Sequence, residues 1–171
     1  MQAQSPNDDS SRVEFLRAVN LFEDIKGNPE ALKRLAHVMR EQKYSPATSI
    51  ITEGSAGAEM YLLIHGQASV YKSTLEGDLY KVAILPSEPP ALFGEGALLD
   101  SDARSATIKA DTECHCLILG REAFEKFSSE YPQWSLPVVQ RIAKVVLARL
   151  KKTNEDLSLL YHALVSEIRG H

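Results

Sequence analysis

The middle of the chain, residues 44–119, consists of short β-branched and aromatic runs separated by turn signals. The separating segments are E-G-S-A-G from Glu53, H-G from His65, L-E-G-D from Leu75 and P-S-E-P-P from Pro86. Short strands at regular spacing, with turns of this kind between them, are typical of closed or double-sheet antiparallel folds. The pattern therefore predicts a β-barrel or jelly roll, and a jelly roll has about eight strands.

Two helical patterns precede this β region. The first begins at a candidate N-cap, Ser10 or Ser11, and continues to Ile25, and the second runs over residues 29–41. Together they predict an N-terminal helical arm. The expected fold class is α+β, with the arm at 1–43, the barrel at 44–120 and C-terminal helices at 121–171.

The last helical pattern is longer than one small domain can cover. Residues 121–130 predict a short helix, and Pro137 is placed to open a second one that reaches about Arg169. A helix of roughly 32 residues is about 48 Å long. Its apolar residues recur at threes and fours: Val139, Ile142, Val146, Leu150, Leu157, Leu160 or Tyr161, Leu164 and Ile168.

A parallel homodimer across this stripe is the simplest way to bury it. The alternative is a helix that breaks near Thr153 and Asn154, where K-K-T-N-E-D interrupts the stripe, and folds back on the barrel.

Residues 93–107 read F-G-E-G-A-L-L-D-S-D-A-R-S-A-T and combine a small-residue turn with a carboxylate and an arginine. Backbone N–H groups at Gly94, Gly96 and Ala97, at the start of a short helix, favour an anion. Arg104 adds a fork of charged donors, and Glu95 is suited to accept a sugar hydroxyl beside a phosphate. The alternative is a surface turn with a solvated glutamate and arginine.

The order of these residues resembles the phosphate-binding cassette of the cyclic nucleotide-binding domain family, in which F-G-E precedes an apolar run and then R-x-A-T. Residues 46–70 resemble the family's first strands, with glycines at Gly54 and Gly66. The likeness covers about 21–157 and extends to the sensor domains of bacterial cyclic-AMP-responsive regulators and of cyclic-AMP-dependent kinase regulatory subunits. Departures are Gly96, where Leu or Ile is usual, and S-E-P-P-A-L at 87–92.

The resemblance implies a binding mode. Arg104 would pair with the cyclic phosphate, Glu95 would accept the ribose 2′-OH, and Thr153 with Asn154 would contact the base. An alternative role for this polar pair is to set a dimer register. The implied ligand-binding residues are Gly94, Glu95, Gly96, Ala97, Leu98, Arg104, Ser105, Ala106, Val82, Ile84, Thr153 and Asn154. Val82, Ile84 and Leu98 would line the sugar side.

The resemblance also implies a regulatory role. The expected ligand is cyclic AMP, with cyclic GMP as the alternative, and no further cofactor is expected. Ligand binding would favour the arrangement in which barrel and long helix both contact the nucleotide. A homodimer through the long helix and an unidentified effector protein are the expected partners. A degenerate domain that has lost its ligand and only dimerises is the competing hypothesis, because Gly96 departs from the family pattern.

Other function classes find little support. An enzyme on a similar barrel needs metal-binding histidines, a nucleophile beside a base or paired carboxylates, and the histidines stand singly. Cys114 and Cys116 share one face of a strand-like T-E-C-H-C, which favours small buried residues over a disulfide or metal pair. We therefore expect no catalytic residue and no metal site.

The net charge and the N-terminal sequence bear on contact with nucleic acid and membranes. A net charge of −4 argues against a nucleic-acid surface. The N-terminus lacks a signal-peptide pattern, and no run approaches the roughly 20 apolar residues of a membrane span. We expect a cytoplasmic protein without membrane contact.

Similar transcription factors continue into a helix-turn-helix domain, whereas this sequence ends at His171. We therefore expect no direct DNA contact, and either a free-standing sensor or the regulatory piece of a longer effector. The basic residues of the last helix, interpreted as a solvated face, are Arg141, Lys144, Arg149, Lys151 and Lys152.

Overall fold

Eight strands form two antiparallel sheets in the computed structural model, which describes residues 9–100 and 103–169. One sheet has the order β1-β8-β3-β6 and the other β2-β7-β4-β5. The strands are β1 (Arg40–Tyr44), β2 (Ser49–Ile51), β3 (Glu59–His65), β4 (Gln67–Ser73), β5 (Leu79–Pro86), β6 (Leu92–Phe93), β7 (Thr107–Ala110) and β8 (Cys114–Gly120). The predicted jelly roll between helical ends is confirmed.

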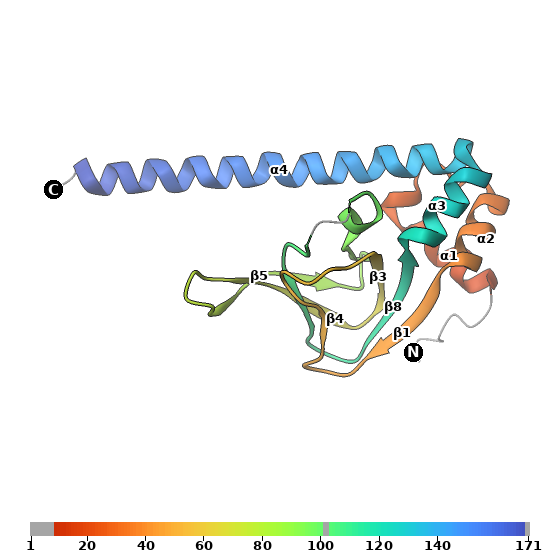
Figure 1. Ribbon diagram of the computed structural model, residues 1–171, viewed down its shortest axis with the longest axis horizontal. Coiled ribbons are helices and arrows are strands. Elements are labelled where there is room, and N and C mark those ends of the chain that lie inside the picture. Colours follow the sequence, from red (N-terminus) through yellow and green to blue (C-terminus); the bar gives the residue numbers. More distant parts are fainter. Residues whose placement is uncertain (1–8, 101–102, 170–171) are drawn as a thin grey trace.

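Helices lie before and after the sheets. Those that precede them are α1 (Asp9–Ala18), the 3₁₀ turn η1 (Asn20–Phe22) and α2 (Pro29–Val38). A second 3₁₀ turn, η2 (Glu95–Leu98), follows β6, and the chain ends with α3 (Arg121–Glu130) and α4 (Pro132–Arg169). Figure 1 shows α1, α2 and α3 gathered at one end of the barrel, from which α4 extends past the sheets.

Several predicted boundaries are wrong at the N-terminal side. The first helix ends at Ala18 instead of Ile25, because the chain tightens into η1, and Ser10 and Ser11 lie inside α1 instead of at its N-cap. The first strand begins at Arg40 instead of Tyr44, since residues 40–44 pair in register with β8. Strand pairing here overrides the local helical pattern.

The long helix begins at Pro132, earlier than the predicted start at Pro137. Proline fits a first helical turn because its missing N–H has no partner there, so Pro132 is a suitable start. Pro137 lies inside the helix, where it cannot donate to the carbonyl four residues earlier.

Two clusters of buried side chains hold the fold together. Side chains of β3 alternate between them: Tyr61 and Leu63 face the space between the sheets, and Met60 and Leu62 face the helices. Ile142 joins α4 to the cluster that faces the helices. The helices are therefore fixed to the outer face of the β1-β8-β3-β6 sheet.

Both cysteines are free and buried in the cluster between the sheets, as predicted. Burial raises the pKa of the Cys116 thiol to about 12, so that this thiol stays protonated at neutral pH. Within residues 9–100 and 103–169, no three His, Cys, Asp or Glu side chains are grouped to hold a metal ion. Over the same residues, no helix has both the length and the apolar content that a membrane span needs.

Helix α4 runs without a break for 38 residues, about 57 Å at 1.5 Å per residue. The alternative of a break near Thr153 and Asn154 is therefore wrong. Buried residues of α4 are Ser135, Val138 and Ile142, all in its first third. Beyond them most of the large apolar side chains are exposed, from 44% at Val146 to 69% at Ile168. Among residues 9–100 and 103–169, nothing covers the apolar stripe over most of its length (Figure 1).

Candidate functional site

Phe93 and Gly94 set the geometry of the 93–107 segment, called the cassette below. Phe93 is buried and stacks on Tyr61, with ring centroids 5.2 Å apart and the planes inclined by 1°. Gly94 has a φ of 71°, in the left-handed region. A Cβ at Gly94 would lie 2.8 Å from Nη1 of Arg104 and 3.0 Å from the carbonyl oxygen of Glu59. A larger residue would therefore strain the backbone and displace the arginine.

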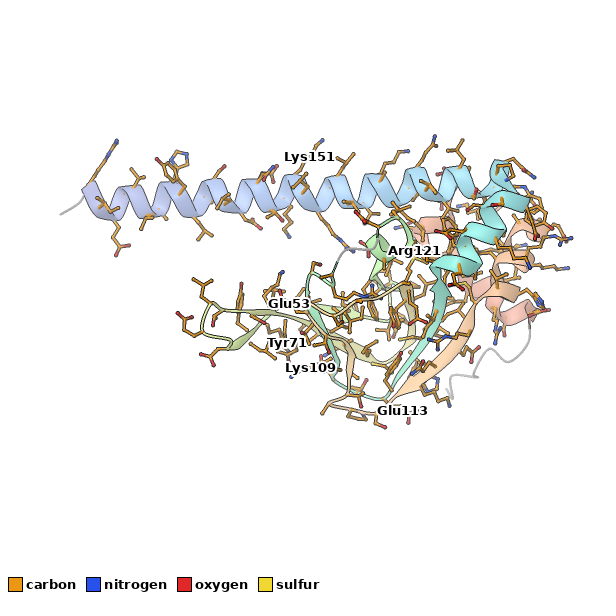
Figure 2. The ribbon with its side chains drawn as sticks, viewed as in Figure 1. Glu53, Tyr71, Lys109, Glu113, Arg121 and Lys151 are labelled. Carbon is orange, nitrogen blue, oxygen red and sulfur yellow. The ribbon has the colours of Figure 1, made fainter. Side chains whose placement is uncertain are left out.

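The short helix predicted after Gly94 is present as η2. The Ala97 N–H donates to the Gly94 carbonyl at 3.1 Å, and the Leu99 N–H donates to the Gly96 carbonyl at 2.9 Å. Arg121, at the start of α3 and labelled in Figure 2, donates from Nε to the Ala97 carbonyl at 2.7 Å and from Nη2 to the Asp100 carbonyl. Gly96 thus does not prevent the turn, which is held from outside by an arginine.

The side chain of Arg104 is held against the cassette. Its Nη1 donates to the Gly94 carbonyl at 3.2 Å, and its Nη2 donates to the Glu59 carbonyl at 2.7 Å. The guanidinium carbon lies 5.9 Å from the centroid of the Tyr61 ring, within reach of a cation–π interaction. These contacts fix the direction in which the positive charge points.

The backbone of Arg104 is held by the loop between β2 and β3. The Arg104 N–H donates to the Ser55 carbonyl at 2.9 Å, and the Gly54 N–H donates to the Arg104 carbonyl at 2.8 Å. Gly57 leaves room for the guanidinium, since a Cβ there would lie 2.2 Å from Nε of Arg104. The sequence did not single out Gly57, although its place in the G-S-A-G turn was visible.

The Glu59 carboxylate is held by two hydrogen bonds. It accepts from Nη2 of Arg40 at 2.6 Å and from the Tyr61 hydroxyl at 2.9 Å. Burial acts to raise the pKa of Glu59, but the hydrogen bonds from Arg40 and Tyr61 outweigh it and lower the pKa. Burial, together with the bond to Glu59, raises the pKa of Tyr61. Glu59 therefore stays ionised, and the residue whose carbonyl holds Arg104 is well anchored.

A pocket with a volume of about 310 Å³ opens beside Arg104. Its polar end is lined by Gly94, Arg104 and Ser105, and its body by apolar residues that include Val70, Ala83 and Leu85. A cation and a hydroxyl beside the apolar residues of one pocket suit an anionic group attached to an apolar body.

A second pocket of about 400 Å³ lies between the cassette and α4. It is lined by Glu95, Gly96 and Ala97 on one side and by Val146 and Arg149 on the other. Arg149 also lines the first pocket. The two hollows therefore share Gly94, Arg104 and Ser105 of the cassette and Arg149 of α4.

Glu95 connects the cassette to α4. It is only 3% exposed, and its carboxylate forms an ion pair with Nη1 of Arg149. The Nη2 atom of Arg149 lies 3.4 Å from the Leu92 carbonyl oxygen. A buried carboxylate is costly without a charged or hydrogen-bonding partner, so this pair is the main polar tie from α4 to the cassette in the described residues.

Arg149 is the site residue that the sequence interpretation missed, because it was grouped with the solvated basic residues. Its spacing carried a signal. Arg149 follows the buried residues Val138 and Ile142 at helical spacing and so lies on the same face of α4. By contrast, Lys151 points away from the barrel in Figure 2.

The structure brings most of the predicted cassette residues to the pockets. Gly94, Arg104 and Ser105 line both, Ala106 lines the first, and Glu95, Gly96 and Ala97 line the second. Leu98 lines neither. It is buried beneath the cassette in the cluster that packs against the helices.

The placement of Val82 and Ile84 on the sugar side is wrong. They are 48% and 54% exposed, and the β5 residues that line the pocket are Ala83 and Leu85. Side chains alternate along a strand, so an error of one residue moves the predicted pair to the opposite face.

Thr153 and Asn154 are exposed on α4 and line neither pocket in one chain. The Thr153 hydroxyl donates to the Arg149 carbonyl at 3.0 Å, one turn back along the helix. Their contact with a base stays a prediction.

Comparison with known proteins gives one family. The family model described as cyclic nucleotide-binding domain matches residues 41–131. The regulatory subunit of cAMP-dependent protein kinase from Colletotrichum orbiculare is 35% identical over 113 residues, 66% of this chain and 27% of that protein. Human cGMP-dependent protein kinase 2 is 28% identical over 142 residues, 82% of this chain and 18% of that protein. The chain thus spans about a quarter or less of the length of these relatives.

Among solved structures, the catabolite activator protein of Thermus thermophilus has a similar fold. It superposes with a TM-score of 0.71 at 28% identity, over 82% of this chain and 62% of that one. The superposed region covers a larger part of this chain than the residues that the family model matches.

Proposed function

Because the chain belongs to the cyclic nucleotide-binding domain family, we propose that it binds cyclic AMP at the cassette and passes the binding event to α4. The observation that carries this proposal is the ion pair between Glu95 and Arg149. The carboxylate suited to accept a ribose hydroxyl is the same one that holds the long helix. A ligand that engages Glu95 therefore acts directly on the tie between barrel and α4.

The proposed binding mode uses both ends of the 310 Å³ pocket. Arg104 and Ser105 meet the cyclic phosphate, assisted by backbone N–H groups of the cassette turn other than that of Ala97, which donates to the Gly94 carbonyl. Val70, Ala83 and Leu85 contact the apolar faces of the sugar and base. This mode requires no catalytic step, and the matched family is one of regulatory binding domains.

Cyclic AMP is preferred as the ligand because relatives named as cAMP-dependent regulatory subunits are 35% and 38% identical. Cyclic GMP is the alternative, supported by the more distant cGMP-dependent kinase. A scaffold that has lost its ligand is a weaker proposal. The η2 turn forms in spite of Gly96, and Glu95 and Arg104 are both in place.

The exposed stripe of α4 supports a second part of the proposal, a homodimer. The apolar side chains beyond Ile142 lie along one helix of about 57 Å, and a second copy of the same helix would cover them. The regulated effector is an unidentified protein, and the site of action is the cytoplasm.

Glu95→Gln tests whether one carboxylate both binds the sugar and holds α4. We expect affinity for cyclic AMP to fall about tenfold, less than on loss of Arg104, because an amide still accepts a hydrogen bond but carries no charge. A 2′-deoxy analogue should bind the wild type less well than cyclic AMP, and the variant should narrow that difference. Calorimetry of each protein with each nucleotide gives the dissociation constants to be compared.

The same variant reports on coupling through Trp134, the only tryptophan of the chain. Trp134 stacks on Tyr131 with centroids 4.8 Å apart where α3 meets α4. Wild-type fluorescence should change in a saturable way with cyclic AMP, and Glu95→Gln should reduce the amplitude at full occupancy. Binding without any fluorescence change in the wild type would contradict coupling to α4. Equal binding of the deoxy analogue would contradict the role of Glu95.

We propose that Thr153 and Asn154, one turn beyond Arg149 on α4, contribute to base selectivity. We expect cyclic AMP to bind about tenfold more tightly than cyclic GMP, a difference of roughly one hydrogen bond. Asn154 can offer a donor and an acceptor to the adenine N6/N7 edge. Thr153→Ala combined with Asn154→Ala should reduce the preference but keep binding. A preference unchanged by the double substitution would show that α4 does not contact the base.

A further inference from the structure

A third cationic side chain lies beside the cassette, in addition to Arg104 and Arg149. Lys72 of β4 donates from Nζ to the carbonyl oxygen of Ser105. The same Nζ lies 3.1 Å from Oε1 of Glu53, in the segment that follows β2. Ser105 lines the first pocket and follows Arg104 directly. An ammonium group is therefore hydrogen-bonded to the residue next to the cassette arginine.

Glu53 holds this ammonium in place. Its second oxygen, Oε2, accepts from the Ser73 N–H at 2.9 Å and from the Ser73 hydroxyl at 3.0 Å. The bond from Lys72 is the largest cause of a lowered pKa at Glu53, followed by the bonds from Ser73. The Glu53 N–H donates to the Thr107 hydroxyl at 2.9 Å, which ties the segment to the end of the cassette.

We propose, on the basis of the binding function above, that Lys72 is a further cationic group beside the nucleotide pocket, in addition to Arg104 and Arg149, and that Glu53 positions it and reduces its charge. The Lys72 ammonium is bonded to the residue that directly follows Arg104, and both Ser105 and Arg104 line the pocket, so its charge lies near the proposed phosphate position. Charges separated by no more than the screening length of about 8–10 Å at ordinary salt still interact, and partly buried charges are screened less. Lys72 would thus attract the phosphate through space while Arg104 binds it directly.

A purely structural role for the pair would rest on the same contacts, and the sign of one substitution separates the two. Removal of Lys72 leaves Glu53 as a negative charge near the phosphate and should weaken binding. Removal of the Glu53 charge leaves Lys72 positive and should preserve or strengthen binding. If the pair only holds the cassette together, both changes should weaken binding.

The experiment is calorimetric titration of Lys72→Met, Lys72→Arg and Glu53→Gln with cyclic AMP at about 50 mM and about 500 mM salt. Lys72→Met should weaken binding about five- to tenfold at low salt and less at high salt, because salt screens the interaction. Lys72→Arg keeps the charge and should bind like the wild type. Glu53→Gln keeps an acceptor for Ser73 and should bind as tightly as the wild type or more so.

Lys109→Met is the matched control. Lys109 lies in the same sheet with its Nζ 5.5 Å from the Tyr71 ring centroid, and in Figure 2 both are labelled farther from α4 than Glu53. Loss of this lysine should leave the affinity nearly unchanged. A wild-type affinity in Lys72→Met, or equal weakening in Lys72→Met and Glu53→Gln, overturns the proposal while the binding function stands. A wild type that binds no cyclic nucleotide removes both proposals. If Lys72→Met does not fold, Glu53→Gln still decides: binding weaker than that of the wild type at low salt overturns the proposal.

Discussion

Arg104→Ala is expected to weaken cyclic AMP binding by about a hundredfold or more while the barrel stays folded. Loss of one partner of a shielded, hydrogen-bonded charge pair costs roughly 2–5 kcal/mol, which corresponds to tens- to thousands-fold in affinity. The guanidinium is held ready for this role by the Gly94 and Glu59 carbonyls. Calorimetry of the variant and the wild type at equal salt measures the loss.

Two controls accompany this variant. Arg104→Lys keeps the charge but lacks the planar fork, so its affinity should lie between those of the wild type and Arg104→Ala. Arg17→Ala removes a half-exposed arginine of α1 and should leave the affinity unchanged. Circular dichroism should show the β-barrel intact in all three. An unchanged dissociation constant in Arg104→Ala would place the phosphate elsewhere.

Truncation after Leu150 is expected to convert a homodimer into a monomer. The removed segment carries apolar side chains that no described part of the chain covers, among them Leu157, Leu160, Tyr161, Leu164 and Ile168, each more than half exposed. Light scattering at tens of micromolar should give twice the chain mass for the full chain and the chain mass for the truncated one. The exposed remnant up to Leu150 should also lower solubility.

A single substitution in the full chain tests the same interface without shortening α4. Leu160→Glu places a charge in the stripe and should shift the full chain toward monomer. Lys151→Glu changes charge on the side of α4 that points away from the barrel and is the matched control. A full chain that is already a stable monomer would overturn the α4 dimer.

Much of the fold followed from local pattern. Regular turns between short apolar runs predicted the two sheets, and Glu95, Arg104, Gly94 and Gly96 line the pockets at the cassette. In β5, however, four consecutive residues of the run K-V-A-I-L are apolar, so both faces of the strand look alike in sequence. Which face points inward depends on how β5 pairs with β4, a pairing that includes a bulge. In the structure Ala83 and Leu85 face the pocket.

The residues that were not predicted depend on contacts between distant segments. Gly57 matters only because Arg104 passes over it, and Lys72 matters only because β4 brings it to Ser105. Arg149 was misassigned for a different reason. A basic residue in a charged run is usually solvated, and the buried carboxylate that attracts it here lies on another element.

Calorimetric titration of the wild-type chain with cyclic AMP and with cyclic GMP tests the central claim most directly. We predict saturable binding of cyclic AMP at one ligand per chain, with a dissociation constant below about 100 µM, and binding of cyclic GMP about tenfold weaker. No saturable heat with either nucleotide at about millimolar concentration, an affinity too weak for the proposed pocket, would contradict the account.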